Sequence, residues 1–542
     1  MPAIAPTVAL EATLEGWHVG LEESSELGET TIVEGTLIDI TADVDNSAPI
    51  EVNYGISGNG PLDRIAQTGT MTFSLNNAAN NSGGVVGYYS PGHTNARTGW
   101  DLGLLCKLKL TYDSVTYYKF AGNLVSIVPD AGSHGRRSVI CTVVDWMDEA
   151  ARAKVKDVTI QTDKRADELI ELLVANAVTK KPLATSYDTG QSTFAYAFDN
   201  LLDAQTTVLR ALADCVISEL GYLYVKGDTT QGGTLRFEDR HARPKYGEAD
   251  ASFDNSMMGL TVDRVRSDVI NRIYVVVHPR TADASVTVLY ELTTTASVPA
   301  ISANESIQII APFKESSIRG YRIAGSSVIS PVSGQDWIAN TASDGSGTNI
   351  TSDVVVTHST TSANSVTFNI QNNGTVSAFI TTLQVRGNAL KDITETLFSA
   401  TSIPSQGTYG ENDVRVSMRY ESNTGTFATE IASWILNTTK DARYVIKEFS
   451  LASNSSDTLM IQSLAREPGD KITIAETVTG LVASGGDESE IGYFINGVNM
   501  SVRPGGIVKT SWVLAPADQQ AAWVLDQKGA SEMGVSTNLG FA

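Results

Sequence analysis

The sequence predicts a mainly β fold with a smaller α+β part, and three observations support this prediction. Most segments are short runs of β-branched and aromatic residues separated by Gly, Asn, Asp and Ser, the pattern of strands and turns. Helical spacing of apolar residues occurs in only a few places. A stretch in the middle shifts to Ser, Thr, Asn and Gly with interleaved Val and Ile, which is typical of a β-sandwich with one wet face.

The clearest strand signals come first in the chain and return near its end. Each is close to strand length and rich in Val, Ile, Tyr or Thr. They cover 106–112, 117–128 with a break at Gly122, 139–144, 270–278 and 414–420.

Three helices are predicted, at 166–177, 206–220 and 427–436, because apolar residues recur there at three and four residue spacing. Gly221 is placed to end the second helix. A hairpin of strands 222–225 and 234–237 should follow it. The inward positions of the three helices are Ile170, Leu173, Val174 and Ala177; Val208, Leu209, Leu212, Cys215 and Val216; and Phe427, Ile431, Trp434 and Ile435.

The Ser/Thr-rich stretch 292–389 predicts an inserted β-sandwich. Disorder is the alternative, suggested by the Gly- and Ser-rich run at 345–351. We reject it for the whole stretch because 354–357, 366–370 and 378–385 hold enough apolar residues for several strands.

The chain has 39 basic and 61 acidic side chains, a net charge of −22. Such a field repels nucleic acid and anionic lipid and disfavours stable DNA binding. Two interpretations remain open. The acidity keeps the protein soluble, or it lines a channel through which DNA passes without sticking.

Residues for catalysis or metal binding do not form a recognisable pattern. Cys106, Cys141 and Cys215 each sit alone in an apolar stretch and are expected to be core residues. The histidines are scattered, at His18, His93, His134, His241, His278 and His358. No hydrolase elbow, phosphate-binding loop or dinucleotide fingerprint occurs. We therefore predict no catalytic, cofactor-binding or metal residues and no cofactor.

Some weaker signals have plain structural interpretations. The spacing in 55–60 imitates a phosphate loop, but Pro61 follows instead of a helix, so a tight turn is expected. The basic cluster His134-Gly-Arg-Arg137 should lie in a turn between two strands. Trp146, Trp434 and Trp512 are expected in the core. Neither a secretion signal nor a membrane-spanning segment is expected.

Several short blocks follow one another in a distinctive order along the chain. In the N-terminal part the polar Thr70, Thr72 and Ser74 alternate with apolar neighbours, as the wall of a barrel requires. The N-terminal blocks are 37–44 (LIDITADV), 68–77 (TGTMTFSLNN), 89–91 (YSP), 103–110 (GLLCKLKL), 118–127 (YKFAGNLVSI) and 139–146 (VICTVVDW). The C-terminal blocks are 409–411 (YGE), 467–474 (EPGDKITI), 493–498 (YFINGV), 504–514 (PGGIVKTSWVL), and the tail with 523–526 (WVLD), Gly534, Leu539 and Gly540.

The order of these blocks resembles the hub or minor tail proteins of long-tailed bacteriophages. The resemblance implies a ring-shaped hub of the tail tip that joins the tail tube to the distal tip and lets DNA pass during genome ejection. It implies two tube-like β-barrels in each copy of a homotrimer. Its implied partners are distal tail and tail tube proteins, the tape measure protein, tail fibre or tip proteins, a host surface receptor, and DNA transiently in the lumen. The protein would be a virion component made in the host cytoplasm.

With this resemblance, five parts are expected along the chain. They are an N-terminal hub barrel at 1–152, a helix-hairpin domain at 153–250, a second hub barrel with one packed helix at 251–291 and 390–527, the peripheral insert at 292–389, and a C-terminal tail at 528–542.

Two other functions remain open beside the structural, non-enzymatic one. The first is a receptor-binding tail adhesin, for host attachment, that uses the insert. The second is a tail-associated hydrolase of cell-wall glycan or peptide, because tail tips often carry such domains. Paired carboxylates for glycoside hydrolysis also stay open, since 61 acidic residues guarantee many pairs.

Overall fold

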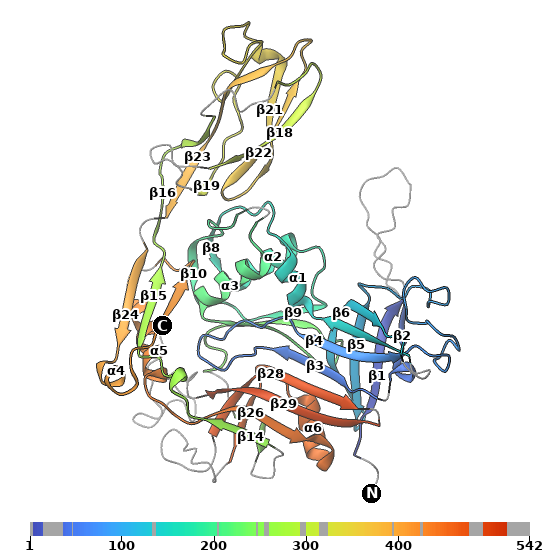
Figure 1. The fold of residues 1–542 in the computed structure, drawn as a ribbon. Coiled ribbons are helices and arrows are strands. Elements are labelled where there is room, and N and C mark those ends of the chain that lie inside the picture. The colour runs from blue at the N-terminus through green and yellow to red at the C-terminus, as the bar shows by residue number, and fades with distance from the viewer. Residues whose placement is uncertain are drawn as a thin grey trace.

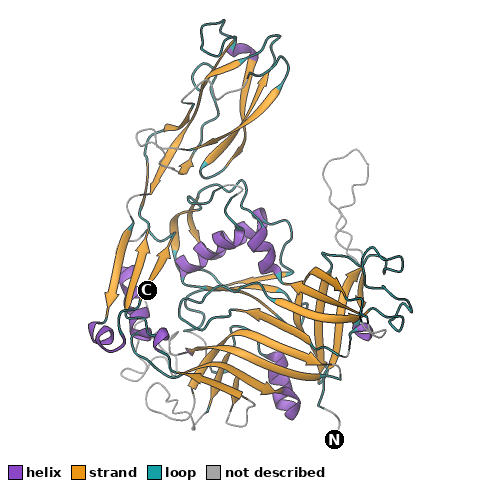
Figure 2. Ribbon diagram, viewed as in Figure 1, coloured by secondary structure: helices purple, strands orange, loops and turns teal. Residues whose placement is uncertain are grey.

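A computed structural model describes residues 4–14, 36–45, 47–132, 137–202, 205–244, 248–253, 259–292, 300–313, 324–392, 395–422, 426–475, 491–503 and 505–517. A large curved sheet forms the base, a group of helices lies above it, and an elongated β module projects away from both (Figure 1). Strands dominate the described residues (Figure 2), which confirms the mainly β prediction. None of the described helices is both long enough and apolar enough to cross a membrane.

The large sheet contains thirteen strands within the described ranges. Its main path runs β14-β26-β29-β28-β3-β4-β7-β6-β5-β1-β2, with β27 beside β28 and β13 beside β27. The strands are β1 Thr7–Leu14, β2 Thr36–Asp39, β3 Ile50–Gly55, β4 Thr70–Asn76, β5 Leu105–Tyr112, β6 Val115–Pro129, β7 Ser138–Val144, β13 Ala251–Phe253, β14 Gly259–Asp263, β26 Val445–Ala452, β27 Lys471–Ile474, β28 Ile491–Arg503 and β29 Ile507–Pro516.

Alternation of apolar and polar residues explains which face of the sheet is buried. In β5 every second residue is buried, and the same period appears in β7. Cys106 and Cys141 point inward and are buried and free, as predicted. One hydrophobic core runs under both ends of the sheet, from Leu10 to Leu514.

The sequence predicts two separate barrels, and the structure corrects this prediction. β3, from the first predicted barrel, pairs antiparallel with β28, from the second, from Gly55 with Gly497 to Ile50 with Val502. The two halves thereby merge, because each strand satisfies the backbone groups along the other's open edge. Between β14 and β2 the described pairings follow an open path, so no closed barrel is found among the described residues.

Helix α6, Asp457–Ala465, packs on this core through Met460 and Leu464. It begins where the Ser456 hydroxyl accepts a hydrogen bond from the Leu459 amide at 3.2 Å. The 3-10 turns η1, Thr41–Asp43, and η5, Ser453–Ser455, also border the sheet.

The helical region above the sheet contains α1 Trp146–Arg152, α2 Ala166–Ala177 and α3 Val208–Glu219. Strands β8 Gln161–Arg165 and β10 Thr193–Ala197 pair with each other, and β9 Ala184–Tyr187, β11 Tyr222–Lys226 and β12 Thr234–Glu238 form a second small sheet. The strands predicted after α3 therefore pair antiparallel, as β11 and β12.

The end of α3 differs from the prediction for Gly221. Leu220, not Gly221, takes the left-handed conformation, with φ 58°. Gly221 is required for a close approach instead, since a Cβ there would lie 2.4 Å from the Glu238 carbonyl oxygen.

The predicted strands at 270–278 and 414–420 are present, but outside the large sheet. β15 Arg272–Val277 lies between β24 Thr396–Thr401 and β25 Asp413–Met418. The third predicted helix, α5 Thr426–Thr439, packs on this sheet with Phe427, Ile431 and Ile435 buried, while Trp434 is only partly buried. Helix α4, Ile403–Tyr409, and the turn η2, Arg266–Asp268, complete this part.

The Ser/Thr-rich stretch forms two sheets around one apolar core. One sheet is β18-β22-β21, and in the other β23 pairs with β16, β17, β19 and β20. β16 and β17 lie before residue 292, so this module begins earlier than the predicted boundary. The strands are β16 Arg280–Ala282, β17 Thr287–Glu291, β18 Ser306–Pro312, β19 Ala324–Ser326, β20 Trp337–Asn340, β21 Val354–Thr361, β22 Ser365–Asn372 and β23 Phe379–Asp392, with the turn η4 Thr351–Asp353.

Candidate assembly surface

The described residues contain no group of three or more His, Cys, Asp or Glu placed to hold a metal ion. His93, His241, His278 and His358 lie on separate segments, and His18 and His134 fall outside the described residues.

A buried ion pair joins three parts of the chain at the Glu467 junction, which we define as Tyr54, Lys119, Gly227 and Glu467. The Lys119 ammonium, on β6, donates to the Glu467 carboxylate in the turn before β27. It also donates to the Leu464 carbonyl at 3.0 Å. The Lys119 side chain is 0% exposed, so its charge depends on these partners.

The other Glu467 oxygen collects two further donors. The Tyr54 hydroxyl, on β3, donates to Oε2 at 2.8 Å, and the Gly227 amide, at the end of β11, donates to the same atom at 2.9 Å. Burial raises the pKa of Tyr54 well above its usual value, and the nearby Glu467 carboxylate raises it further, so the phenol stays a donor. One carboxylate thus ties the β3 strand, the β6 strand and the β11–β12 hairpin together.

A second buried network joins the end of β12 to β28. Arg243 donates from Nε to Glu238 at 3.0 Å and from Nη1 to Asn496 at 2.8 Å, while its guanidinium lies 3.6 Å over the Tyr222 ring. Asn496 in turn donates to the Gly58 carbonyl at 2.7 Å. The turn predicted at 55–60 is therefore fastened to β28.

The Asp199 junction, defined as Asp199, His278, Arg280 and Arg419, lies at the root of the projecting module. Asp199 accepts hydrogen bonds from Arg280 at 2.8 Å and from Arg419 at 2.7 Å. Arg419 Nη1 lies 2.9 Å from His278 Nδ1. This junction couples the helical region to the β15–β24–β25 sheet.

Asp145 links the large sheet to α1. Its carboxylate accepts the Met147 amide at 3.0 Å and caps the helix. Gly69 makes room for it, because a Cβ there would lie 2.4 Å from Oδ2. Burial raises the pKa of Asp145 to about 7.

An exposed apolar group, the outer strip, consists of Val125, Val128 and Ile140 on the outward face of β6 and β7. Val128 and Ile140 are register partners, and they are 54% and 47% exposed. The hairpin predicted around His134-Gly-Arg-Arg137 is this one, although 133–136 lie outside the described residues. Apolar side chains that gather on one solvent-facing side of a hairpin are a candidate surface for protein contact.

The strands that end the described path, β2 and β14, are a second surface of this kind. Each is paired on one side within the described residues, with β1 and β26 respectively. Strand edges offer backbone donors and acceptors to another chain.

Sequence reasoning missed the two junctions. Lys119 inside an apolar strand was a usable signal, since a lysine in a buried strand needs a partner. Glu467-Pro-Gly-Asp was noticed only as a block of the resemblance. The partners of the two central carboxylates lie 81 to 413 residues away from them, and no local pattern connects them.

No protein-family model matches the chain, and no curated protein matches it in sequence. Solved structures that it resembles include a tail protein from Neisseria meningitidis MC58, with TM-score 0.46 and 7% identity, covering 95% of this chain and 99% of that one. The prophage MuSo2 43 kDa tail protein from Shewanella oneidensis has TM-score 0.44 and 8% identity, with 95% and 98% covered. Prophage tail protein gp18 from Listeria monocytogenes EGD-e has TM-score 0.38 and 7% identity, with 94% of each chain covered.

Proposed function

We propose that this chain is a structural protein of a phage tail tip, which forms a ring-shaped hub between the tail tube and the distal tip. The observation that carries the proposal is the pairing of β3 with β28. It fuses an N-terminal and a C-terminal β half into one curved sheet around one core. Each copy then brings an N-terminal and a C-terminal half of this sheet to the ring, and three copies bring six halves. A homotrimer of this kind can match sixfold and threefold neighbours.

The outer strip and the end strands β2 and β14 supply contact surfaces for the ring. Covering Val128 and Ile140 removes apolar area from water, at about 25 cal/mol per Å². Among the described residues the sheet follows an open path. Pairing of its strand edges between copies closes this path around the axis.

The acidic balance suits a ring through which DNA moves. A net charge of −22 keeps phosphates from binding to the wall during genome ejection. Distal tail and tail tube proteins, the tape measure protein and tail fibre or tip proteins are the partners expected at the two ends of the ring.

The mass of the full-length protein in solution and the number of copies around the axis of intact tails test this proposal. We expect three copies in both. Replacing Val128 and Ile140 together by lysine should lower the trimer fraction at least tenfold, whereas Val115→Lys, at an exposed turn elsewhere on β6, should leave it unchanged. One copy per tail, without a ring, would overturn the proposal.

A receptor-binding adhesin is the second candidate, and the projection of the β16–β23 module from the body favours it (Figure 1). Deleting residues 281–391, which removes the module and keeps Arg280 and its register partner Asp392, separates the candidates. Intact tails that no longer adsorb to the host indicate the adhesin, and failed tail assembly indicates the hub. A zymogram on purified peptidoglycan tests the hydrolase alternative, for which no clearing is expected.

A further inference from the structure

The projecting module presents an ordered polar surface on its β18-β22-β21 sheet. Backbone register places Ser306, Gln371 and Val355 in one row. A second row contains Gln308, Asn369 and Thr357, and a third begins with Ile310 and Thr367. We call these eight residues the uncharged face.

The uncharged face points outward because its neighbours along each strand point inward. Val354 and Val356 of β21 and Val366, Phe368 and Ile370 of β22 are buried in the module's core. Side chains alternate between the two faces of a strand. The eight residues therefore share the solvent side of the sheet, where Ile310 is 69% and Val355 44% exposed.

The charge of this part of the chain differs from that of the rest. Residues 292–389 hold five acidic and four basic side chains, a net charge of −1, while the whole chain carries −22. The uncharged face itself contains only amides, hydroxyls and two aliphatic side chains. Its electrostatic complement is a ligand without charge.

The functional groups on the face suit a sugar. Gln and Asn side chains each present both a donor and an acceptor, and Ser and Thr hydroxyls do the same. Strand spacing sets these groups in a grid of about 4.8 Å across the sheet. A glycan presents hydroxyls at its ring edges and C–H groups on its ring faces, which match the amides and the exposed Ile310 and Val355.

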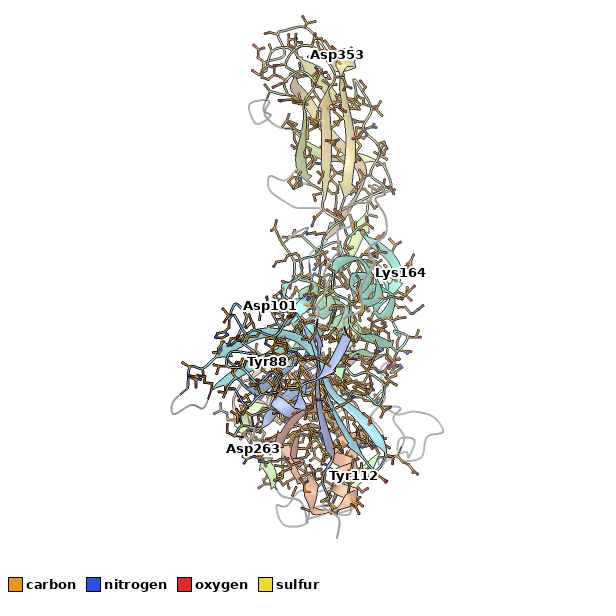
Figure 3. The ribbon with its side chains drawn as sticks, turned by 90° about the vertical axis from the view of Figure 1, so that its right-hand side faces the viewer. Tyr88, Asp101, Tyr112, Lys164, Asp263 and Asp353 are labelled. Atoms are coloured by element: carbon orange, nitrogen blue, oxygen red, sulfur yellow. The ribbon has the colours of Figure 1, made fainter. Side chains whose placement is uncertain are left out.

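Contacts at the inner end of the module attach it to the helical region. The turn between β21 and β22 contacts the helical region, where the Ala363 amide donates to the Val158 carbonyl at 2.9 Å and the Asn364 side chain donates to the Leu201 carbonyl. Asp353 lies at the far end of the module (Figure 3). The sheet therefore extends away from the acidic body.

We propose that the uncharged face binds a neutral glycan, with the amides of Gln308, Asn369 and Gln371 as the principal hydrogen-bonding groups. This inference deepens the adhesin candidate and does not depend on ring formation. Failure of the ring and failure of glycan binding are measured separately, by copy number and by affinity.

The test uses the full-length protein on an array of neutral hexose and N-acetylhexosamine oligosaccharides together with uronic-acid oligosaccharides. We expect binding to neutral members only, and at least a tenfold loss of affinity in the double variant Gln308→Ala, Asn369→Ala. Asn373→Ala is the matched control, because Asn373 is exposed in the turn after β22 and outside the face. It should bind like the wild type.

Equal melting temperatures of the three proteins establish that the variants fold. Absence of binding to every neutral oligosaccharide overturns the proposal, as does binding to the uronic-acid members alone. Concentration-dependent self-association that the double variant abolishes would also overturn it, since a second copy would then cover the face.

Discussion

The body of the molecule and its projecting module solve the burial of polar groups in different ways. In the body, charged side chains are taken out of water and neutralised by partners from distant segments, as Lys119 is by Glu467. In the module, Asn372 is equally buried, but it is an uncharged amide that donates to the carbonyls of Ile301, Ser302 and Val376. Removing one partner of a buried ion pair lowers stability strongly, because the other charge stays buried without a counter-charge. Removing one member of a network of neutral amides lowers stability less, because no charge is left buried.

The largest effect is expected at the Glu467 junction. Glu467→Gln leaves the Lys119 ammonium buried without a counter-charge, and should lower the free energy of unfolding by about 3 to 5 kcal/mol. Denaturant titration measures this. Glu448→Gln, at an exposed position of β26, serves as the control and should change little. Adding Lys119→Met to Glu467→Gln should recover much of the loss, and no recovery would show that the ion pair is not the cause.

A slightly smaller effect is expected at the Asp199 junction. Asp199→Asn removes the negative charge that faces Arg280 and Arg419, at a cost of about 3 kcal/mol. Amide hydrogen exchange should become faster in β10, β15 and β25, because Asp199, His278 and Arg419 lie just after these three strands. Asp413→Asn, at an exposed residue of β25, should leave exchange unchanged. Uniformly faster exchange across the large sheet would contradict a local role.

Asp145 should make stability depend on pH. Its folded pKa of about 7 lies above the unfolded value. The protonated carboxyl group therefore contributes to the stability of the folded state at low pH, and this contribution is lost as pH rises toward 7. Asp145→Asn removes this dependence. The difference in unfolding free energy between variant and wild type should move in favour of the variant by about 1.4 kcal/mol per pH unit, or about 2 kcal/mol between pH 5.5 and 7. A constant difference across that range would show that the folded pKa is not raised.

The smallest effect is expected in the module. Asn372→Ala should cost about 1 to 2 kcal/mol, since the carbonyls of Ile301 and Ser302 also accept the amides of Ala378 and Glu305. Thermal unfolding of the full chain measures it. A loss as large as that of Glu467→Gln would remove the contrast between the two regions.

Local elements could be predicted from the sequence and long-range pairings could not. The predicted strand at 106–112 corresponds to β5, and the predicted helix at 166–177 has the bounds of α2, because periodicity within one segment determines them. The pairing of β3 with β28 joins residues more than 400 positions apart, so no pattern within either segment predicts it. The barrels were predicted as separate for this reason.

The same limit applies to the surfaces. Trp146 and Trp512 are buried, as predicted from their apolar surroundings. The outer strip was missed because Val128 and Ile140 look like core residues in the sequence, and only their register shows that they face solvent together. The predicted tail at 528–542 lies outside the described residues.

The double attachment of the projecting module has a mechanical consequence. Arg280 at its root is fastened to Asp199, and Ala363 on its inner turn is fastened to Val158, so both anchors reach the helical region. A pull at the far end of the module therefore acts as a torque on that region instead of swinging the module about its connecting strands. Because the β11–β12 hairpin of the same region contacts Glu467 through Gly227, the helical region passes this load on to the large sheet.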